Sequence, residues 1–531
     1  MSRKTSSSFP IPSRFNRKTL NIIIIVVAIL IAILSQTGDF DALEKALSPK
    51  STSSPEATTK TIPETIPEAE TAPEAKTAPE AKPKTGYQKT DENTLLTLLK
   101  NTPFKDPELL SLDVQQWQHS SGAPIYFVPS PNLPMVDIRL IFNAGSARDG
   151  DLPGLAQLSA ALFDEGTQEL DVEAIAERFE SIGAQFSASA HRDMAVISLR
   201  TLKLNQYEDA ALALTEQLIS RPTFPQDSID RIKAQMLRYL EYQQQNPGAL
   251  VNKAMWQHLF PEHPYGSPTE GTVEGLESIE QTDIQSFYET FYVSANATVA
   301  IVGALEPKRA QNIANTLLDS LKTGTKAPTL PEPKPVTGSH HHIDYPSQQT
   351  HIRVAQLGLK RTVEDYVPFY VGNEILGGSG FASLLNQAIR QDRGLAYSVY
   401  STFVGMQQLG PFWLDLKTEN DQATNALTVS LDTLNAFIAE GPTEKQLLDV
   451  KTNIINGHPM LLASNASQLG FIGNMGFYQM PLERLTRFLL DVSDTRLDTV
   501  KNAWQKRFNP AENHDGTTSW LIITLGPEKP E

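Results

Sequence analysis

The sequence of 531 residues contains no cysteine, which excludes disulfide bridges and thiolate metal ligands. Positive charge is also scarce, because 45 Lys and Arg stand against 61 Asp and Glu, and the formal net charge is −16. This balance provides no basic face for a phosphate backbone, so we expect no nucleic acid partner. Two catalytic signatures are missing as well, namely a Gly-x-Ser-x-Gly nucleophile elbow and a Walker phosphate loop.

Charge is absent between Thr19 and Gly38, and the residues from Leu20 to Leu34 are almost all apolar. A bilayer is crossed by roughly 20 such residues. Basic residues precede the run and acidic residues follow it from Asp39 onward, so the positive-inside rule places the rest of the chain outside the cytoplasm. We therefore predict a single-pass anchor in the inner membrane with the globular part in the periplasm. A cleaved signal peptide is the alternative, although no small-x-small cleavage site follows.

A repeat of Pro, Glu, Ala, Thr and Lys follows the anchor, over residues 48 to about 90. Such a composition cannot bury enough apolar surface to offset the entropy of ordering. Its prolines favour an extended spacer. We predict a disordered stalk, with a specific Pro-rich docking motif as the alternative.

Hydrophobic periodicity begins at about Asn93. Alternating apolar residues predict a half-buried strand over 136–142 and a hairpin that turns at residues 191–193. Between them, leucines at helical spacing predict a helix over 155–162. A second helix should begin after Asp171, a good N-cap, and end at Gly183.

The same order of elements returns in the second half, after a Pro-rich linker. Three anchor points recur at one constant offset along the chain: Leu199-Arg200-Thr201 with Leu416-Lys417-Thr418, Pro225 with Pro442, and Phe291 with Phe508. A repeat of this length indicates duplicated domains rather than a solenoid.

The most informative stretch of the second half runs from Leu376 to Tyr400. Gly377, Gly378 and Gly380 predict a tight turn. Apolar residues at helical spacing predict one buried helix face over 381–389. Gly394 should end this helix, and a strand should begin at residue 396.

This stretch resembles the C-terminal-half signature of the insulinase-like (pitrilysin, inverzincin) metallopeptidases. In that family an Arg and a Tyr at the spacing of Arg390 and Tyr397 hold the substrate backbone and the developing oxyanion. Further segments resemble the family: HPYGSPTEGT, FYVSANATVAIVG and SNASQLGFIGNMGFYQMP. The resemblance implies an α+β fold, in which two homologous α/β-sandwich domains, each a mixed sheet with helices, form half of a clamshell.

The family's zinc motif, His-x-x-Glu-His, is missing at the matching place. Gln157 and Ala161 stand where the two His belong, and Ala160 replaces the general base. The third ligand position falls near Tyr239, and the neighbouring Glu241 should point elsewhere. We therefore expect no metal on this chain.

The dense cluster at residues 340–342, three consecutive His, lies beside the Pro-rich linker and, by prediction, just before a strand. It suits adventitious metal capture rather than catalysis. Asp164 and Glu165 follow the first helix, and we expect both to face solvent.

Some members of the family are split into a zinc subunit and a sister subunit that supplies the Arg/Tyr pair, and this chain resembles the sister. The resemblance implies a substrate-binding, oxyanion-stabilising subunit that is inactive alone and degrades peptides with a zinc-bearing partner. An inactive peptide-binding or scaffold protein of the same fold is the alternative. An autonomous metallopeptidase requires ligands that the sequence lacks.

The predicted organisation is a cytoplasmic N-terminus at 1–18, a transmembrane anchor at 19–38, a disordered linker at 39–92, a first peptidase-like domain at 93–325, an interdomain linker at 326–340 and a second peptidase-like domain at 341–531.

Overall fold

The computed structural model describes residues 112–508 and 520–530, which all belong to one compact unit. The predicted anchor at 19–38 and the predicted linker at 39–92 lie outside these residues. Within the described ranges, no helix is both long and apolar enough to cross a bilayer.

The first domain is built on a six-stranded mixed sheet in the order β1-β2-β6-β3-β5-β4, in which only the β2–β6 pair is parallel. Its central strands are covered on both faces, because β6 is completely buried and β3 is nearly so. The strands are β1 (Gln115–Gln118), β2 (Pro124–Pro129), β3 (Met135–Phe142), β4 (Gln185–Ala190), β5 (Ala195–Leu202) and β6 (Ala297–Gly303).

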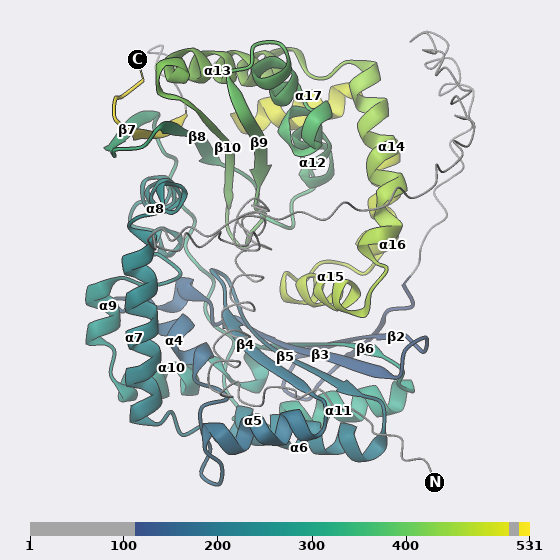
Figure 1. Cartoon of the computed structure of the whole chain (residues 1–531). Helices are drawn as coiled ribbons and strands as arrows, with labels where there is room; N and C mark the ends of the chain where they lie inside the picture. The colour runs from purple at the N-terminus through teal and green to yellow at the C-terminus, as the bar shows by residue number, and fades with distance from the viewer. Residues whose placement is uncertain (1–111, 509–519, 531) are drawn as a thin grey trace, which may run out of the picture. The chain divides into compact units, whose positions relative to one another are not determined.

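Helices cover this sheet, with α5, α6 and α11 on one face (Figure 1). The predicted cap of α5 is confirmed, since the Asp171 carboxylate accepts a hydrogen bond from the Ala174 N–H at 2.9 Å. Gly183 closes that helix with φ of +63°. The helices are η1 (Ser146–Arg148), α4 (Leu155–Ala161), α5 (Val172–Ser181), α6 (Asn205–Ser220), α7 (Gln226–Gln243), α8 (Pro247–Leu259), η2 (Pro264–Gly266), α9 (Val273–Ser278), α10 (Gln281–Phe291), η3 (Ser294–Asn296) and α11 (Pro307–Ser320).

The second domain has a five-stranded mixed sheet in the order β7-β11-β8-β10-β9, again with one parallel pair, β7–β11. An aromatic cluster around Trp504 fills its core. Its elements are β7 (Ser339–Asp344), β8 (Gln349–Leu357), α12 (Tyr366–Asn373), η4 (Glu374–Gly378), η5 (Gly380–Ala382), η6 (Asn386–Gln391), β9 (Ala396–Phe403), β10 (Pro411–Glu419), η7 (Asn420–Gln422), α13 (Ala423–Glu440), α14 (Glu444–Leu461), α15 (Asn465–Phe477), α16 (Glu483–Asp494), α17 (Leu497–Phe508) and β11 (Leu521–Gly526).

The two domains exchange one helix each. Helix α8 belongs to the first half of the chain but packs on β8 and β11 of the second sheet. Helix α15 lies on the face of the first sheet opposite α5, α6 and α11 (Figure 1). Helices α8 and α15 have the same length, as do α7 and α14, and both pairs begin 218 residues apart (465 − 247 and 444 − 226), one residue more than the sequence anchors (416 − 199). The structure therefore confirms the internal repeat and extends it to the exchanged helices.

Two local predictions are corrected around Leu376–Tyr400. Gly377 and Gly378 lie in the π-helix η4 rather than in a tight turn, and only Gly380 has a positive φ, of +60°. A Cβ on Gly377 would lie 2.3 Å from the Ser401 backbone nitrogen, so this glycine permits close packing against β9. The predicted helix that follows is also largely π-helical, as η6, although its buried face and its end at Gly394 are confirmed.

The three consecutive His precede the predicted strand, which is β8, and they also lie on a strand of their own, β7. His340 and His342 both contact the Thr524 hydroxyl, at 2.9 and 3.0 Å, while the His341 ring stacks on His258 of α8. These side chains therefore help to hold β7 and α8 on the second sheet.

Candidate functional site

Helix α4 carries the positions of the lost zinc motif. Its N-terminus is capped by the buried Asp149, whose two carboxylate oxygens each accept a backbone N–H at 2.8 Å, from Gly154 and Ala156. Burial raises the pKa of Asp149 to about 7, although these two hydrogen bonds oppose the change. The Asp149 carboxylate therefore holds the start of α4 in place by accepting hydrogen bonds from the backbone of that helix.

The residues present at this helix do not fit zinc. Ala160 is buried and Ala161 half-buried, and neither has a donor atom, while Gln157 is half-buried and offers only a neutral amide. On α7, Glu241 is exposed. Across the described part of the chain, no group of three or more His, Cys, Asp or Glu could hold a metal ion. Zinc sites in proteins use three or four N, O or S ligands, and this arrangement does not provide them.

Glu165, which we expected to face solvent, is instead half-buried and forms an ion pair with Arg231 of α7. Asp164 is exposed as expected. The pair ties the end of α4 to α7, so Glu165 has a structural partner of its own.

Arg390 and Tyr397 are brought together in the second domain. The guanidinium carbon of Arg390, on η6, lies 4.7 Å from the centroid of the Tyr397 ring, in a cation–π contact. Tyr397 is 73 % exposed and lies on β9, the edge strand of its sheet. The pairing of β9 with β10 is irregular next to it, between Leu416 and Thr418. A cation and a phenol held side by side on an exposed edge can both donate hydrogen bonds to an oxygen outside the chain.

A buried polar cluster that we did not predict from the sequence joins the two domains. Asp193, 3 % exposed in the β4–β5 turn, accepts hydrogen bonds from the Tyr265 hydroxyl at 2.5 Å, the Gln407 N–H at 2.9 Å and the Tyr478 hydroxyl at 3.1 Å. Burial raises the pKa of Asp193, and these hydrogen bonds oppose that change.

Beside Asp193, the Arg192 guanidinium lies 3.8 Å from the Trp256 ring centroid and donates to the Tyr265 and Ser267 carbonyls. The sequence signal for this cluster was present, because the turn at 191–193 was predicted. What the sequence did not indicate was that this turn is buried against the other domain.

Models of known families match the chain in two places. The model described as "Insulinase (Peptidase family M16)" matches residues 127–273, and the one described as "Peptidase M16 inactive domain" matches residues 278–454. The chain is also similar to the crystal structure of a peptidase M16 inactive domain from Pseudomonas fluorescens. Identity is 38 %, the match covers 79 % of this chain and 99 % of that one, and the TM-score is 0.75.

Two curated relatives illustrate how such chains are named. A Helicobacter pylori protein named "Non-peptidase homolog YmxG" is 28 % identical over 68 % of this chain and 84 % of its own length. A Bacillus subtilis protein named "Uncharacterized zinc protease YmxG" is 22 % identical over 74 % of this chain and 96 % of its own. The crystal structure of a Helicobacter pylori protease, at 17 % identity, covers 78 % of this chain and 100 % of that one with a TM-score of 0.70, and shares the fold.

Proposed function

Because the chain belongs to the insulinase family (peptidase family M16), we propose that it is the non-zinc subunit of a two-chain peptidase. The observation that carries this proposal is a contrast within one molecule. None of the zinc-ligand and general-base positions on α4 keeps a His or a Glu, while Arg390 and Tyr397 remain paired on an exposed edge. The family resemblance to a peptidase inactive domain and to a non-peptidase homolog supports it.

In this role Arg390 and Tyr397 act on the substrate carbonyl. A peptide carbonyl oxygen gains negative charge when it is attacked, and donors placed at that oxygen stabilise the charge. The Tyr397 hydroxyl and the Arg390 guanidinium are such donors, and the cation–π contact limits the rotamers of both. The zinc ion and the base that activates water then belong to a His-x-x-Glu-His partner of the same family. Removing one oxyanion donor typically lowers kcat by about 10² to 10³.

The test is reconstitution of the full chain with a zinc-bearing partner and an unfolded, internally quenched peptide. We expect no hydrolysis by this chain alone. In the complex, Tyr397→Phe and Arg390→Ala should each lower kcat by about 10² or more without changing complex formation in gel filtration.

Two neighbours serve as matched controls. Tyr400 lies on the same strand, and Arg393 donates to the Ala388 carbonyl at 2.9 Å. Tyr400→Phe and Arg393→Ala should leave kcat within about twofold, as expected for residues with no contact to the reacting atoms. Equal rates for the Arg390 and Tyr397 variants and their controls would remove the assigned role.

We also propose that the protein is tethered by residues 19–38 to the inner membrane, with the two domains in the periplasm. The flanking charges and the Pro-rich segment at 39–92 support this location. Protease added to spheroplasts should degrade the domains while the membrane stays intact. Protection until lysis would place them in the cytoplasm.

A peptide-binding or scaffold role without hydrolysis is the second candidate. The 73 % exposure of Tyr397 favours it, because an exposed ring serves a binding surface as well as a hydroxyl donor does. The Tyr397→Phe variant separates the two, since binding to the ring survives loss of the hydroxyl and oxyanion stabilisation does not.

A further inference from the structure

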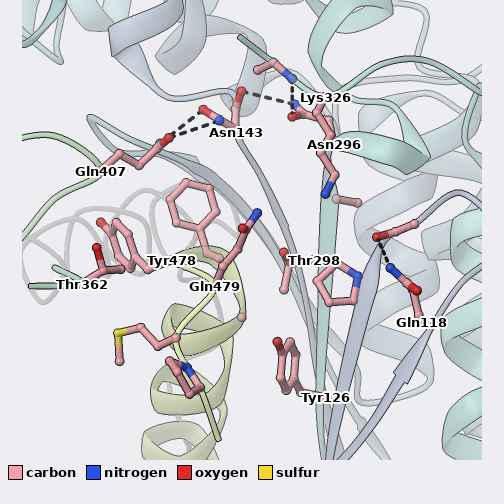
Figure 2. Close-up of a pocket in the computed structure, with 18 of the residues that line it drawn as sticks. Gln118, Tyr126, Asn143, Asn296, Thr298, Lys326, Thr362, Gln407, Tyr478 and Gln479 are labelled. Carbon is pink, nitrogen blue, oxygen red and sulfur yellow. Dashed lines mark hydrogen bonds between the residues drawn. The ribbon is translucent and has the colours of Figure 1, made fainter. Parts of the chain in front are cut away.

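A cavity of about 1040 Å³ opens between the two domains, apart from helix α4 and from the Arg390 and Tyr397 pair. It is bordered by β1, β2 and β6 of the first sheet, by the C-terminal end of α15 and by the β9–β10 turn. Figure 2 shows Tyr126, Thr298, Gln118 and Gln479 arranged around the open space. The cavity is therefore a second candidate site, distinct from the one already described.

The walls of this cavity are polar but almost uncharged. Amides and hydroxyls dominate, and only Lys326 and Glu483, both exposed, bring charge. Aromatic rings from Tyr126, Phe477 and Tyr478 complete the lining. Neutral donors and acceptors next to aromatic rings suit an extended polypeptide, whose backbone both donates and accepts and whose prolines pack on rings.

At the related place in the repeat, the surface is covered by the interdomain linker, whose first residues, Lys326, Ala327 and Thr329, also line the cavity. The interdomain linker runs past the end of α8 and along the second sheet, with Leu330 and Val336 in the apolar cluster. Its carbonyls accept hydrogen bonds from His263, to Pro331 at 2.9 Å, and from Gln408, to Leu330 at 2.6 Å. Two ion pairs at the surface contact its side chains: Lys334 with Glu262 at 2.6 Å and Glu332 with Lys360 at 2.5 Å.

Three of the residues that contact the linker have counterparts in the cavity, at the same offset as the sequence anchors of the repeat. Glu262 corresponds to Gln479, Lys360 to Asn143, and His263 to Met480, and all three counterparts line the cavity. Glu262 and Gln479 even share a left-handed backbone, with φ of 57° and 52°, just after their exchanged helices. The cavity is therefore the repeat-related partner of the linker groove, with both ion-pairing residues replaced by neutral amides.

We propose that this cavity binds an extended segment of another polypeptide, uncharged where it meets Gln479 and Asn143. The fold already holds an extended, Pro-rich chain in the related groove, and the exchange of Glu and Lys for amides sets the preference for neutral side chains. A charged side chain placed against an amide has no opposite charge to compensate its desolvation.

The chain's own stalk is the less suitable occupant. Its sequence at 79–86, PEAKPKTG, matches the linker sequence at 331–338, PEPKPVTG, at six of eight positions, including the Glu and the first Lys. Those two charges pair with Lys360 and Glu262 in the linker groove. At the related positions the cavity has the amides of Asn143 and Gln479, and the Asn143 oxygen already accepts hydrogen bonds from Arg148 at 3.0 and 3.2 Å.

The test uses two fluorescein-labelled peptides and the full chain, followed by anisotropy. One has the linker sequence APTLPEPKPVTG, and the other is its neutral version APTLPQPQPVTG. We expect the neutral peptide to bind saturably and about two- to fivefold more tightly, the range of an exposed ion pair. Gln479→Glu, which installs the residue of the linker groove, should reduce or reverse this ratio through the peptide Lys.

The matched control is Glu262→Gln, which makes the reverse change at the related position, in the groove that the linker occupies. It should leave the affinities of both peptides unchanged. Four outcomes overturn the proposal: no saturable binding of either peptide, a ratio insensitive to Gln479→Glu, a ratio changed by Glu262→Gln, or binding seen only after deletion of residues 48–90. The first two remove the site, the third places the peptide in the linker groove, and the last makes the stalk the occupant. Hydrolysis is not a readout, so the result is independent of the role of Arg390 and Tyr397.

Discussion

Replacing Asp149 by Asn should remove a loss of stability that the wild type shows between about pH 4 and pH 7, although the variant gives up one hydrogen bond at the start of α4. Asp149 is 4 % exposed, and burial raises its pKa from an ordinary value of 3.8 to about 7. Each pH unit between the two values corresponds to about 1.4 kcal/mol, so ionisation costs the folded state roughly 4 kcal/mol. Because the pKa of Asp149 is higher in the folded state than in the unfolded state, the neutral carboxyl favours folding at low pH. This contribution to the free energy of unfolding is complete below about pH 4 and is lost as the pH rises to about 7.

The assay is urea unfolding of the wild type and of Asp149→Asn at pH 5 and pH 8. The Asn amide can accept only one of the two backbone N–H groups, from Gly154 and Ala156, and its NH2 group faces the other, so the variant loses about 1 to 3 kcal/mol at either pH. Between pH 5 and pH 8 the unfolding free energy of the wild type should fall by roughly 3 kcal/mol relative to that of the variant, because only the wild type buries a charge. Other titrating groups are common to both proteins and cancel in the difference.

Asp171→Asn is the control, since Asp171 caps α5 through an exposed carboxylate and buries no charge. Its effect should be alike at both pH values and should stay near 1 kcal/mol. If the difference between Asp149→Asn and the wild type is the same at pH 5 and pH 8, the carboxylate of Asp149 is not destabilised by burial and the reasoning fails.

Two further predictions concern packing and domain association. Gly377→Ala places a Cβ 2.3 Å from the Ser401 backbone nitrogen and should lower the free energy of unfolding by about 1 to 3 kcal/mol. The control is Gly457→Ala on α14, where no atom lies within 4 Å of the added Cβ, and it should raise the free energy of unfolding by about 0.5 to 1 kcal/mol. Thermal unfolding checks both, and equal effects would contradict the close approach. Asp193→Ala leaves the Tyr478 hydroxyl and two other donors without their acceptor, which should cost about 3 to 5 kcal/mol and speed proteolysis of the interdomain linker. An unchanged cleavage rate would show that Asp193 does not hold the domains together.

Much of the local structure could be predicted because it depends on neighbours in sequence. The strand at β3, the cap at Asp171 and the stop at Gly394 follow from alternation, capping and glycine conformation. The π-helices could not, because η4 and η6 depend on contacts with β9, and Gly377 is required by Ser401, which belongs to a later element of the chain.

The candidate site also has one part that the sequence predicts and one part that depends on the fold. The loss of zinc donors at Gln157, Ala160 and Ala161 was readable from residue types alone, since Ala has no atom that can bind metal. That Tyr397 is exposed with Arg390 against its ring depends on how η6 and β9 meet, which no spacing specifies.

The internal repeat, the missing metal ligands and the neutral amides at Asn143 and Gln479 are properties of the sequence itself. Only the tertiary structure decided that α8 and α15 change places, and that exchange is what lays the end of one repeat against the sheet of the other. The physical reason is that a helix can bury its apolar face against any sheet with a complementary surface. Which sheet it covers depends on long-range contacts, among them the packing of α15 on β6 and the hydrogen bonds of Asp193, and these contacts bring Gln479 and Asn143 to the same cavity.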